Sequence, residues 1–217
     1  MKMGKAIILV LCFCMLGLTA CGEVIHQENA SNKEATDEIA ATVSSLSIEK
    51  DGSISSTIIE DFFESYYDED GLKSMIESLI DEYEAENASA QIKLKSCKVK
   101  DGVANVRMDY GDYQAYAGYN AEVFFAGTIK DANMAGFDLN VTLKSVSDDT
   151  TASKPELLGM GDSHIVIVGC EEEPEQPELL RINCFDEILY VSDGVTTVGK
   201  KSADVSLSKG YRIIVFK

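Results

Sequence analysis

The sequence predicts an α+β fold, in which antiparallel sheet hairpins accompany one or two helices and a small all-β C-terminal part follows. The first observation is that Asp-Gly pairs stand between β-rich runs at 51–52, 101–102 and 193–194. Asp-Gly favours the type I′ hairpin turn because both central residues of that turn need positive φ. The second observation is one strongly amphipathic helix, and the third is a closing series of short apolar runs. Together they indicate a largely antiparallel meander.

The clearest helix is predicted over residues 70–86. Its apolar residues follow Leu72 at offsets of 3, 4, 7, 8 and 11, so they share one face. The acidic residues 68–70 stand at its amino end, where negative charge favours the helix dipole. A second helix is expected over 113–129, softened by Gly118.

The second half of the chain predicts more strands than helices. Alternate residues from Phe137 to Leu143 are apolar, which is typical of a half-buried strand. Residues 147–163 predict a loop with one helical turn, and the run "HIVIVG" after them predicts a strand. We therefore expect an α+β domain over 46–150, and over 160–217 a small β domain or a continuation of the same sheet.

The first 20 residues predict a signal peptide. Lys2 and Lys5 give the start of the chain a positive charge, and an uncharged apolar run follows over 6–18. This run is too short for a membrane-spanning helix, which needs about 20 residues. The next residues, Leu-Thr-Ala-Cys at 18–21, resemble the lipobox of bacterial lipoproteins. That resemblance implies cleavage before Cys21, a diacylated thiol and anchoring to the outer face of the cell membrane. A polar, flexible tether is expected up to about residue 45.

Three further stretches carry a second resemblance. The stretches "IIEDFFESYYDEDGLKSMIE", "ILYVSDGV" and "YRIIVFK" are similar to uncharacterised lipoproteins of Gram-positive gut bacteria, and the similarity covers most of the chain after the signal peptide. None of these stretches is a catalytic motif. The resemblance therefore implies an exported protein that is not an enzyme, and it implies no site residues.

The charge of the chain restricts its partners. It carries 37 acidic residues against 19 lysines and arginines, a formal net charge of −18. Such a chain repels a phosphate backbone and anionic headgroups, which excludes nucleic acid as a partner. We expect contact with the membrane through the N-terminal lipid alone, and a protein or a surface polymer as the binding partner.

Three cysteines remain in the part after Cys21. Their odd number and the lack of a Cys-x-x-Cys pair argue against a disulfide framework and against a zinc site. Cys170 and Cys184 could close a loop of 15 residues, a bridge that contributes roughly 3 kcal/mol in the chain-entropy model. The alternative is that both thiols are free. Cys97 is expected as a small apolar core residue.

A hydrolase is the alternative to a binding role. Gly161-Asp162-Ser163 resembles the first block of the GDSL-type esterases, which implies Ser163 as a nucleophile. The block precedes a strand here, whereas it follows one in that family, and His164 is the one imidazole expected in the folded part. A catalytic serine needs a base and a group that orients the base. A turn at the entry of a strand is therefore the preferred interpretation, and paired carboxylates are the other route to a hydrolase.

Two patterns resemble binding sites more weakly. Asp68, Asp70 and Glu77 match ligand positions of a calcium-binding EF-hand loop, but Tyr66 occupies the first position and the helix start explains the acids. Tyrosines recur every three residues over 110–119, a spacing that spirals around a helix instead of forming a platform. We expect these tyrosines to be buried or half-buried, and we expect neither a metal nor a cofactor.

Overall fold

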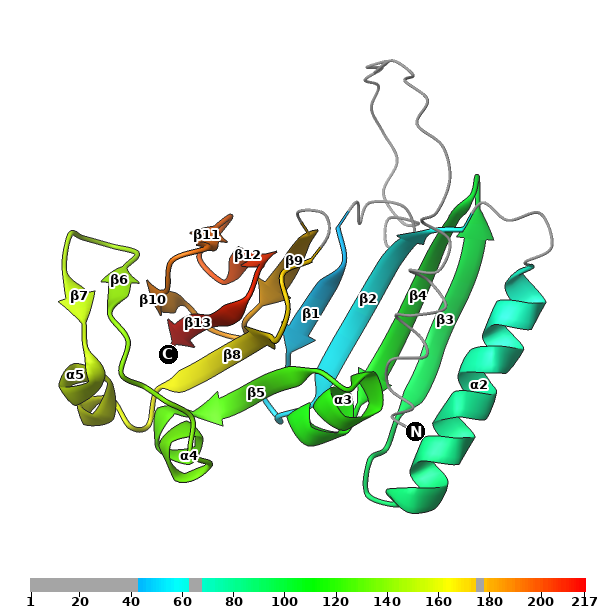
Figure 1. The fold of residues 1–217 in the computed structure, drawn as a ribbon, viewed down its shortest axis with the longest axis horizontal. Helices are drawn as coiled ribbons and strands as arrows, with labels where there is room; N and C mark the ends of the chain where they lie inside the picture. Colours follow the sequence, from blue (N-terminus) through cyan, green and yellow to red (C-terminus); the bar gives the residue numbers. More distant parts are fainter. Residues whose placement is uncertain (1–42, 63–67, 175–177) are drawn as a thin grey trace, which may run out of the picture.

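A computed structural model describes residues 43–62, 68–174 and 178–217. The predictions for the signal peptide, for Cys21 and for most of the tether fall on residues 1–42 and lie outside the described residues. Within the described ranges the chain forms thirteen strands in two sheets and four helices, a mixed fold dominated by strands (Figure 1). The α+β class is therefore confirmed, whereas the expectation of one or two helices was too low.

The first sheet has seven strands in the order β11-β12-β9-β1-β2-β4-β3. Two hairpins, β1–β2 and β3–β4, form one half of this sheet, and β1 then pairs in parallel with β9. Helix α2 lies along β3, at one end of the sheet (Figure 1). The elements are β1 (Ser45–Ile48), β2 (Ile54–Asp61), α2 (Glu69–Glu86), β3 (Lys93–Lys100), β4 (Val103–Tyr110), β9 (Glu178–Asn183), β11 (Val195–Thr197) and β12 (Ser202–Leu207).

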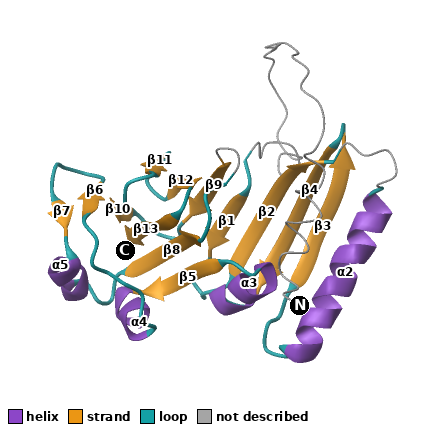
Figure 2. Ribbon diagram, in the orientation of Figure 1, coloured by secondary structure: helices purple, strands orange, loops and turns teal. Residues whose placement is uncertain are grey.

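The second sheet has six strands in the order β5-β8-β13-β10-β6-β7. Strand β13 is central, because it pairs with β8 on one side and with β10 on the other. Three short helices accompany this sheet or lead into it (Figure 2). The elements are α3 (Tyr113–Asn120), β5 (Val123–Thr128), α4 (Ile129–Met134), β6 (Leu143–Ser145), β7 (Thr151–Ala152), α5 (Lys154–Gly159), β8 (His164–Cys170), β10 (Ile188–Val191) and β13 (Gly210–Phe216).

Two of the three Asp-Gly pairs form the expected hairpins. Asp101 and Gly102 both adopt positive φ, 54° and 76°, and join β3 to β4. Gly52, with φ of 90°, lies in the turn between β1 and β2. The third pair does not close a hairpin: Gly194 has φ of 77°, but it lies between β10 and β11, which belong to different sheets. A turn signal fixes the local chain reversal, not which strands pair.

The helix predicted over 113–129 forms only in its first half, and a strand replaces it in the second half. Helix α3 ends at Asn120, where Ala121 adopts a left-handed conformation with φ of 54°. The apolar run that follows forms β5, with Phe124 and Phe125 both buried. Aromatic residues suit a pleated, buried surface, and short apolar runs do not distinguish helix from strand by periodicity.

The strand predicted over 137–143 forms only at its end, as β6. Leu139 and Leu143 are nevertheless both fully buried in one apolar core, so their alternation reflects burial without a ladder over most of the run. The strands after residue 160 enter both sheets: β9, β11 and β12 join the first sheet, and β8, β10 and β13 join the second.

Two apolar cores result, and sheet two takes part in both. Val166 and Val168 of β8 belong to the larger core, which also contains residues of sheet one, α2 and α3. Ile165 and Ile167 belong to the smaller core, which is closed by Ile129, Ala132 and Leu157 from α4 and α5. Alternation along β8 thus directs successive side chains to opposite faces, as expected of a strand buried on both sides.

Candidate functional site

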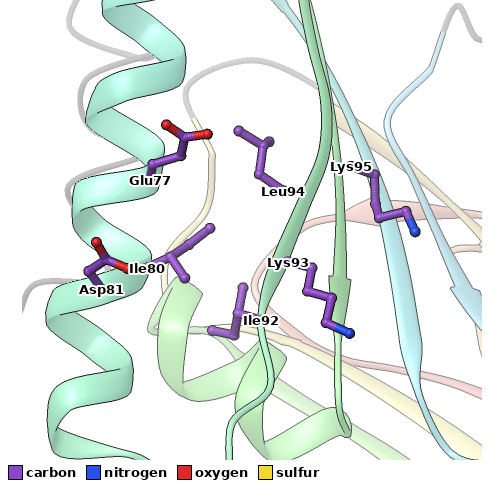
Figure 3. A pocket seen from close by; sticks show the side chains of 7 residues that line it. All are labelled: Glu77, Ile80, Asp81, Ile92, Lys93, Leu94 and Lys95. Carbon is purple, nitrogen blue, oxygen red and sulfur yellow. The ribbon is translucent and has the colours of Figure 1, made fainter.

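An open groove of about 460 Å³ lies between α2 and β3, and we call it the α2–β3 groove. Figure 3 shows Ile80, Ile92 and Leu94 in the space between helix and strand, while Lys93 and Lys95 point away from the helix. Ile80 and Ile92 are buried and Leu94 is half-buried, so the floor is apolar. The residues that line it are Glu77, Ile80, Asp81, Ile92, Lys93, Leu94 and Lys95.

An N-terminal cap and a buried apolar face stabilise α2, the helical wall of the groove. Asp68 caps α2, since its carboxylate accepts a hydrogen bond of 2.6 Å from the Gly71 amide. Leu72, Ile76 and Ile80 then fall on one buried face, which holds the helix against the sheet. The predicted helix is confirmed to within one residue. The cap also assigns Asp68 a structural role, while Tyr66 of the EF-hand resemblance lies outside the described residues.

The strand wall is the outer strand of a hairpin. β3 pairs with β4 alone among the described strands, so its other edge faces α2. The register shifts between Leu94 and Ser96, which marks a bulge at Lys95. Lys95 lies 3.4 Å from the Asp109 carboxylate, on the sheet face opposite to the groove. The bulge thus places Lys95 on the same outer face as Lys93.

Two glutamates of α2 bond the free edge of β3. Glu69 accepts a hydrogen bond of 3.0 Å from the Val99 amide, and Glu84 accepts one of 2.7 Å from the Ile92 amide. Lys98 adds an ion pair to Glu69 at 3.7 Å. These contacts supply hydrogen-bond acceptors to the amides at the two ends of the β3 edge, as a neighbouring strand would.

The two walls carry opposite charge. Helix α2 contains seven acidic residues and a single lysine, whereas β3 contains four lysines and no acid. The lysines fall on the outer face of β3, which concentrates positive charge on one hairpin of an otherwise acidic protein. Beneath the helix, burial first and the nearby Glu69 second raise the pKa of the Cys97 thiol, so Cys97 is a protonated core residue.

The segment predicted as an alternative catalytic site has a structural role. The carbonyls of Ser163 and Gly161 accept hydrogen bonds from the Ile129 and Lys130 amides, at 2.9 and 3.1 Å, and so cap α4. The half-buried His164 ring packs against Phe185 and Phe216, with centroids 4.7 and 5.3 Å away. Its Nδ1 is buried without a hydrogen-bond partner among the described residues, so no described carboxylate orients the ring through that nitrogen.

The tyrosines of residues 110–119 are buried or, at Tyr113, half-buried, as expected. Tyr110, Tyr116 and Tyr119 are each at most 6% exposed and pack edge to face or at a tilt. Burial raises the pKa of Tyr110 to about 12. Tyr116 donates a hydrogen bond of 2.7 Å to Glu122, and burial raises the pKa of the Glu122 carboxyl despite that bond. Sequence reasoning missed Glu122, which carries no motif.

The cysteines do not form the bridge considered above. Cys97, Cys170 and Cys184 are all free. Cys170 ends β8 close to Glu178, at the start of β9, whereas Cys184 follows the end of β9. A strand of six residues therefore intervenes and carries the second thiol about 20 Å along the sheet. Residues 179–183, expected within the closing series of short strands, form most of that strand.

Comparison with known proteins places no constraint on the site. A scan against protein-family models, a search of curated proteins and a search of solved structures found no significant match. Within the described ranges, no three His, Cys, Asp or Glu side chains are placed to hold a metal ion. None of the helices described combines the length and the apolarity that crossing a lipid bilayer requires.

Proposed function

We propose that the protein is an exported lipoprotein, anchored to the outer face of a bacterial membrane by lipidated Cys21, and that it binds a protein partner in the α2–β3 groove. The basic start, the apolar run and the lipobox-like residues before Cys21 support the anchor. Two or more acyl chains hold a protein stably at a membrane, whereas a single chain holds it only marginally.

The observation that carries the binding role is the construction of the groove. Its floor is apolar, its rim is charged, and one wall is the edge of a sheet. Binding sites combine apolar surface with a few placed polar groups in this way. The groove walls offer carboxylates and amines but no activated nucleophile, because Cys97 lies buried beneath the helix.

The alternative function, a cell-surface hydrolase that uses Ser163 or paired carboxylates, has weaker support. Ser163 is half-buried and its carbonyl caps α4, and His164 packs against two phenylalanine rings that also contact each other. We therefore infer a non-enzymatic binding module as the function that the site supports best.

The anchor is tested by replacing Cys21 with serine in the full-length chain. The variant is expected to leave the membrane fraction or to keep its signal peptide, because no thiol is present for acylation. Membrane fractionation and the mass of the recovered chain report both outcomes. Detergent-dependent fractionation identical to that of the parent chain would contradict lipidation at Cys21.

The binding role is tested by photo-crosslinking in living cells of a bacterium that produces the protein. A benzophenone amino acid replaces Asp81 on the groove rim, and in a matched control it replaces Met134, which is 74% exposed on α4. A discrete adduct at position 81 that is lacking at position 134 supports a partner in the groove. Equal adducts at both positions, or an adduct at position 134 alone, would contradict it.

A further inference from the structure

We propose that the α2–β3 groove receives its partner as an added β-strand: one extended segment pairs with the free edge of β3, with apolar residues toward α2 and acidic residues beside the lysines. This inference rests on the proposed binding role of the groove and names the chemistry of the segment bound there. It follows from three properties of the groove: the open sheet edge, the apolar floor and the separation of charge.

The hydrogen-bonding register shows which groups of β3 are available. In an antiparallel pair, alternate residues direct their N–H and C=O groups away from the partner strand. Val99 and Ile92 direct their amides away from β4, as their hydrogen bonds to Glu69 and Glu84 show. The same alternation, taken across the bulge at Lys95, directs the amides of Leu94 and Cys97 away from β4, and of these two residues Leu94 lines the groove.

The two glutamates mark the ends of the free edge. They act as carbonyls of a neighbouring strand would act, but only at Ile92 and Val99. The stretch between them spans seven residue steps, about 23 Å of extended chain. That length suits a segment of four to six residues. Addition of such a strand to an exposed edge is a recurrent mode of peptide recognition, in which main-chain bonds supply affinity and side-chain pockets supply specificity.

The side chains on the two faces define the segment. A strand next to β3 alternates its side chains between the groove and the outer face. On the groove side it meets Ile80 and Leu94, which favour apolar residues. On the outer side it lies beside Lys93, Lys95 and Lys98, which favour acidic residues. The bound segment therefore alternates apolar and acidic residues.

The same charges argue against a second copy of this chain as the occupant. Pairing of β3 with β3 of another copy would bring lysines of both strands onto one face, and like charges across a strand pair are destabilising. Lysines on an edge strand are a common protection against such self-association. A partner of opposite charge turns this protection into selectivity.

The test uses the full-length protein in detergent micelles and synthetic hexapeptides with blocked ends. The first peptide alternates valine and glutamate, the second alternates valine and lysine, and the third is the first with N-methyl groups on alternate amides. Fluorescence anisotropy measures affinity. We expect the glutamate peptide to bind about tenfold more tightly than the lysine peptide, from several exposed ion pairs of modest strength. N-methylation is expected to abolish binding.

A matched pair of variants separates local charge from net charge. Lys93→Glu with Lys95→Glu reverses two charges beside the groove, and Lys130→Glu with Lys209→Glu reverses two exposed charges elsewhere. The first variant is expected to lose its preference for the glutamate peptide, and the second to keep it. Circular dichroism checks that both fold.

Hydrogen exchange supplies the structural readout. On binding of the glutamate peptide, the amide of Leu94 is expected to become protected, whereas exchange at the distant β12 stays unchanged. Binding without this protection, equal affinity for the lysine peptide, or no binding of any peptide would overturn strand addition. If crosslinks at position 81 persist under any of those results, the binding role stands and the strand-addition mode fails; if they are lacking too, both fail.

Discussion

Replacement of Phe216 by alanine tests the central position of β13. Phe216 is 1% exposed, and its ring lies 5.0 Å from that of Phe185 and 5.3 Å from that of His164, centroid to centroid. Residues near a chain end are commonly tolerant of change. Here the side chain fills the larger core, so its truncation should lower the free energy of unfolding by about 3–5 kcal/mol.

Urea denaturation followed by circular dichroism measures this loss, since the chain has no tryptophan. With a slope near 2 kcal/mol per molar urea, the midpoint should fall by about 2 M. The control is Lys217→Ala, which removes an exposed ion pair to Glu187 and should shift the midpoint by less than about 0.5 M. A Phe216→Ala shift as small as that of the control would refute the packing described for β13.

Three further predictions concern other parts of the fold. Burial raises the pKa of Glu122 above 4.5, so this carboxyl binds a proton more readily in the folded protein than in the unfolded chain. The contribution of Glu122 to the free energy of unfolding therefore falls as the pH rises from 4.5 through the raised pKa. Glu122→Gln should therefore gain stability relative to the parent chain across that range; urea midpoints between pH 4 and 8 check this, and a constant difference would contradict it. Asp68→Ala removes the cap of α2 and should cost about 1 kcal/mol by the same assay, whereas an unchanged midpoint would show that the cap is dispensable. Alkylation of the urea-unfolded chain without reductant should label all three thiols of the folded part, which are those of Cys97, Cys170 and Cys184. If the mass of the alkylated chain rises further only after reduction, two of the thiols form a bridge and the prediction is wrong.

Local patterns in the sequence were sufficient for part of the fold. The apolar stripe from Leu72 to Tyr83 predicted α2 because helical periodicity continues over about three turns. The pair at Asp101 predicted a hairpin because its turn joins strands adjacent in sequence. The pair at Asp193 failed, because a local turn signal carries no information about which distant strands become neighbours.

The sequence predicted the charges of the groove but not the groove itself. The lysines of β3 and the acids of α2 are visible as charge runs, but nothing in either run shows that the helix lies against that edge. The bonds from Glu69 to Val99 and from Glu84 to Ile92 depend on tertiary placement. Glu84 bonds an amide eight residues away, across the loop that returns from helix to strand.

The parallel pairing of β1 with β9 has a consequence for how the protein is made. Ser45 pairs with Arg181, and the second sheet closes only when β13 inserts between β8 and β10. Neither sheet can be completed from the first half of the chain. Folds that depend on such distant pairings form slowly. A chain that emerges from its N-terminus first would therefore stay without either complete sheet until the residues up to Phe216 had appeared.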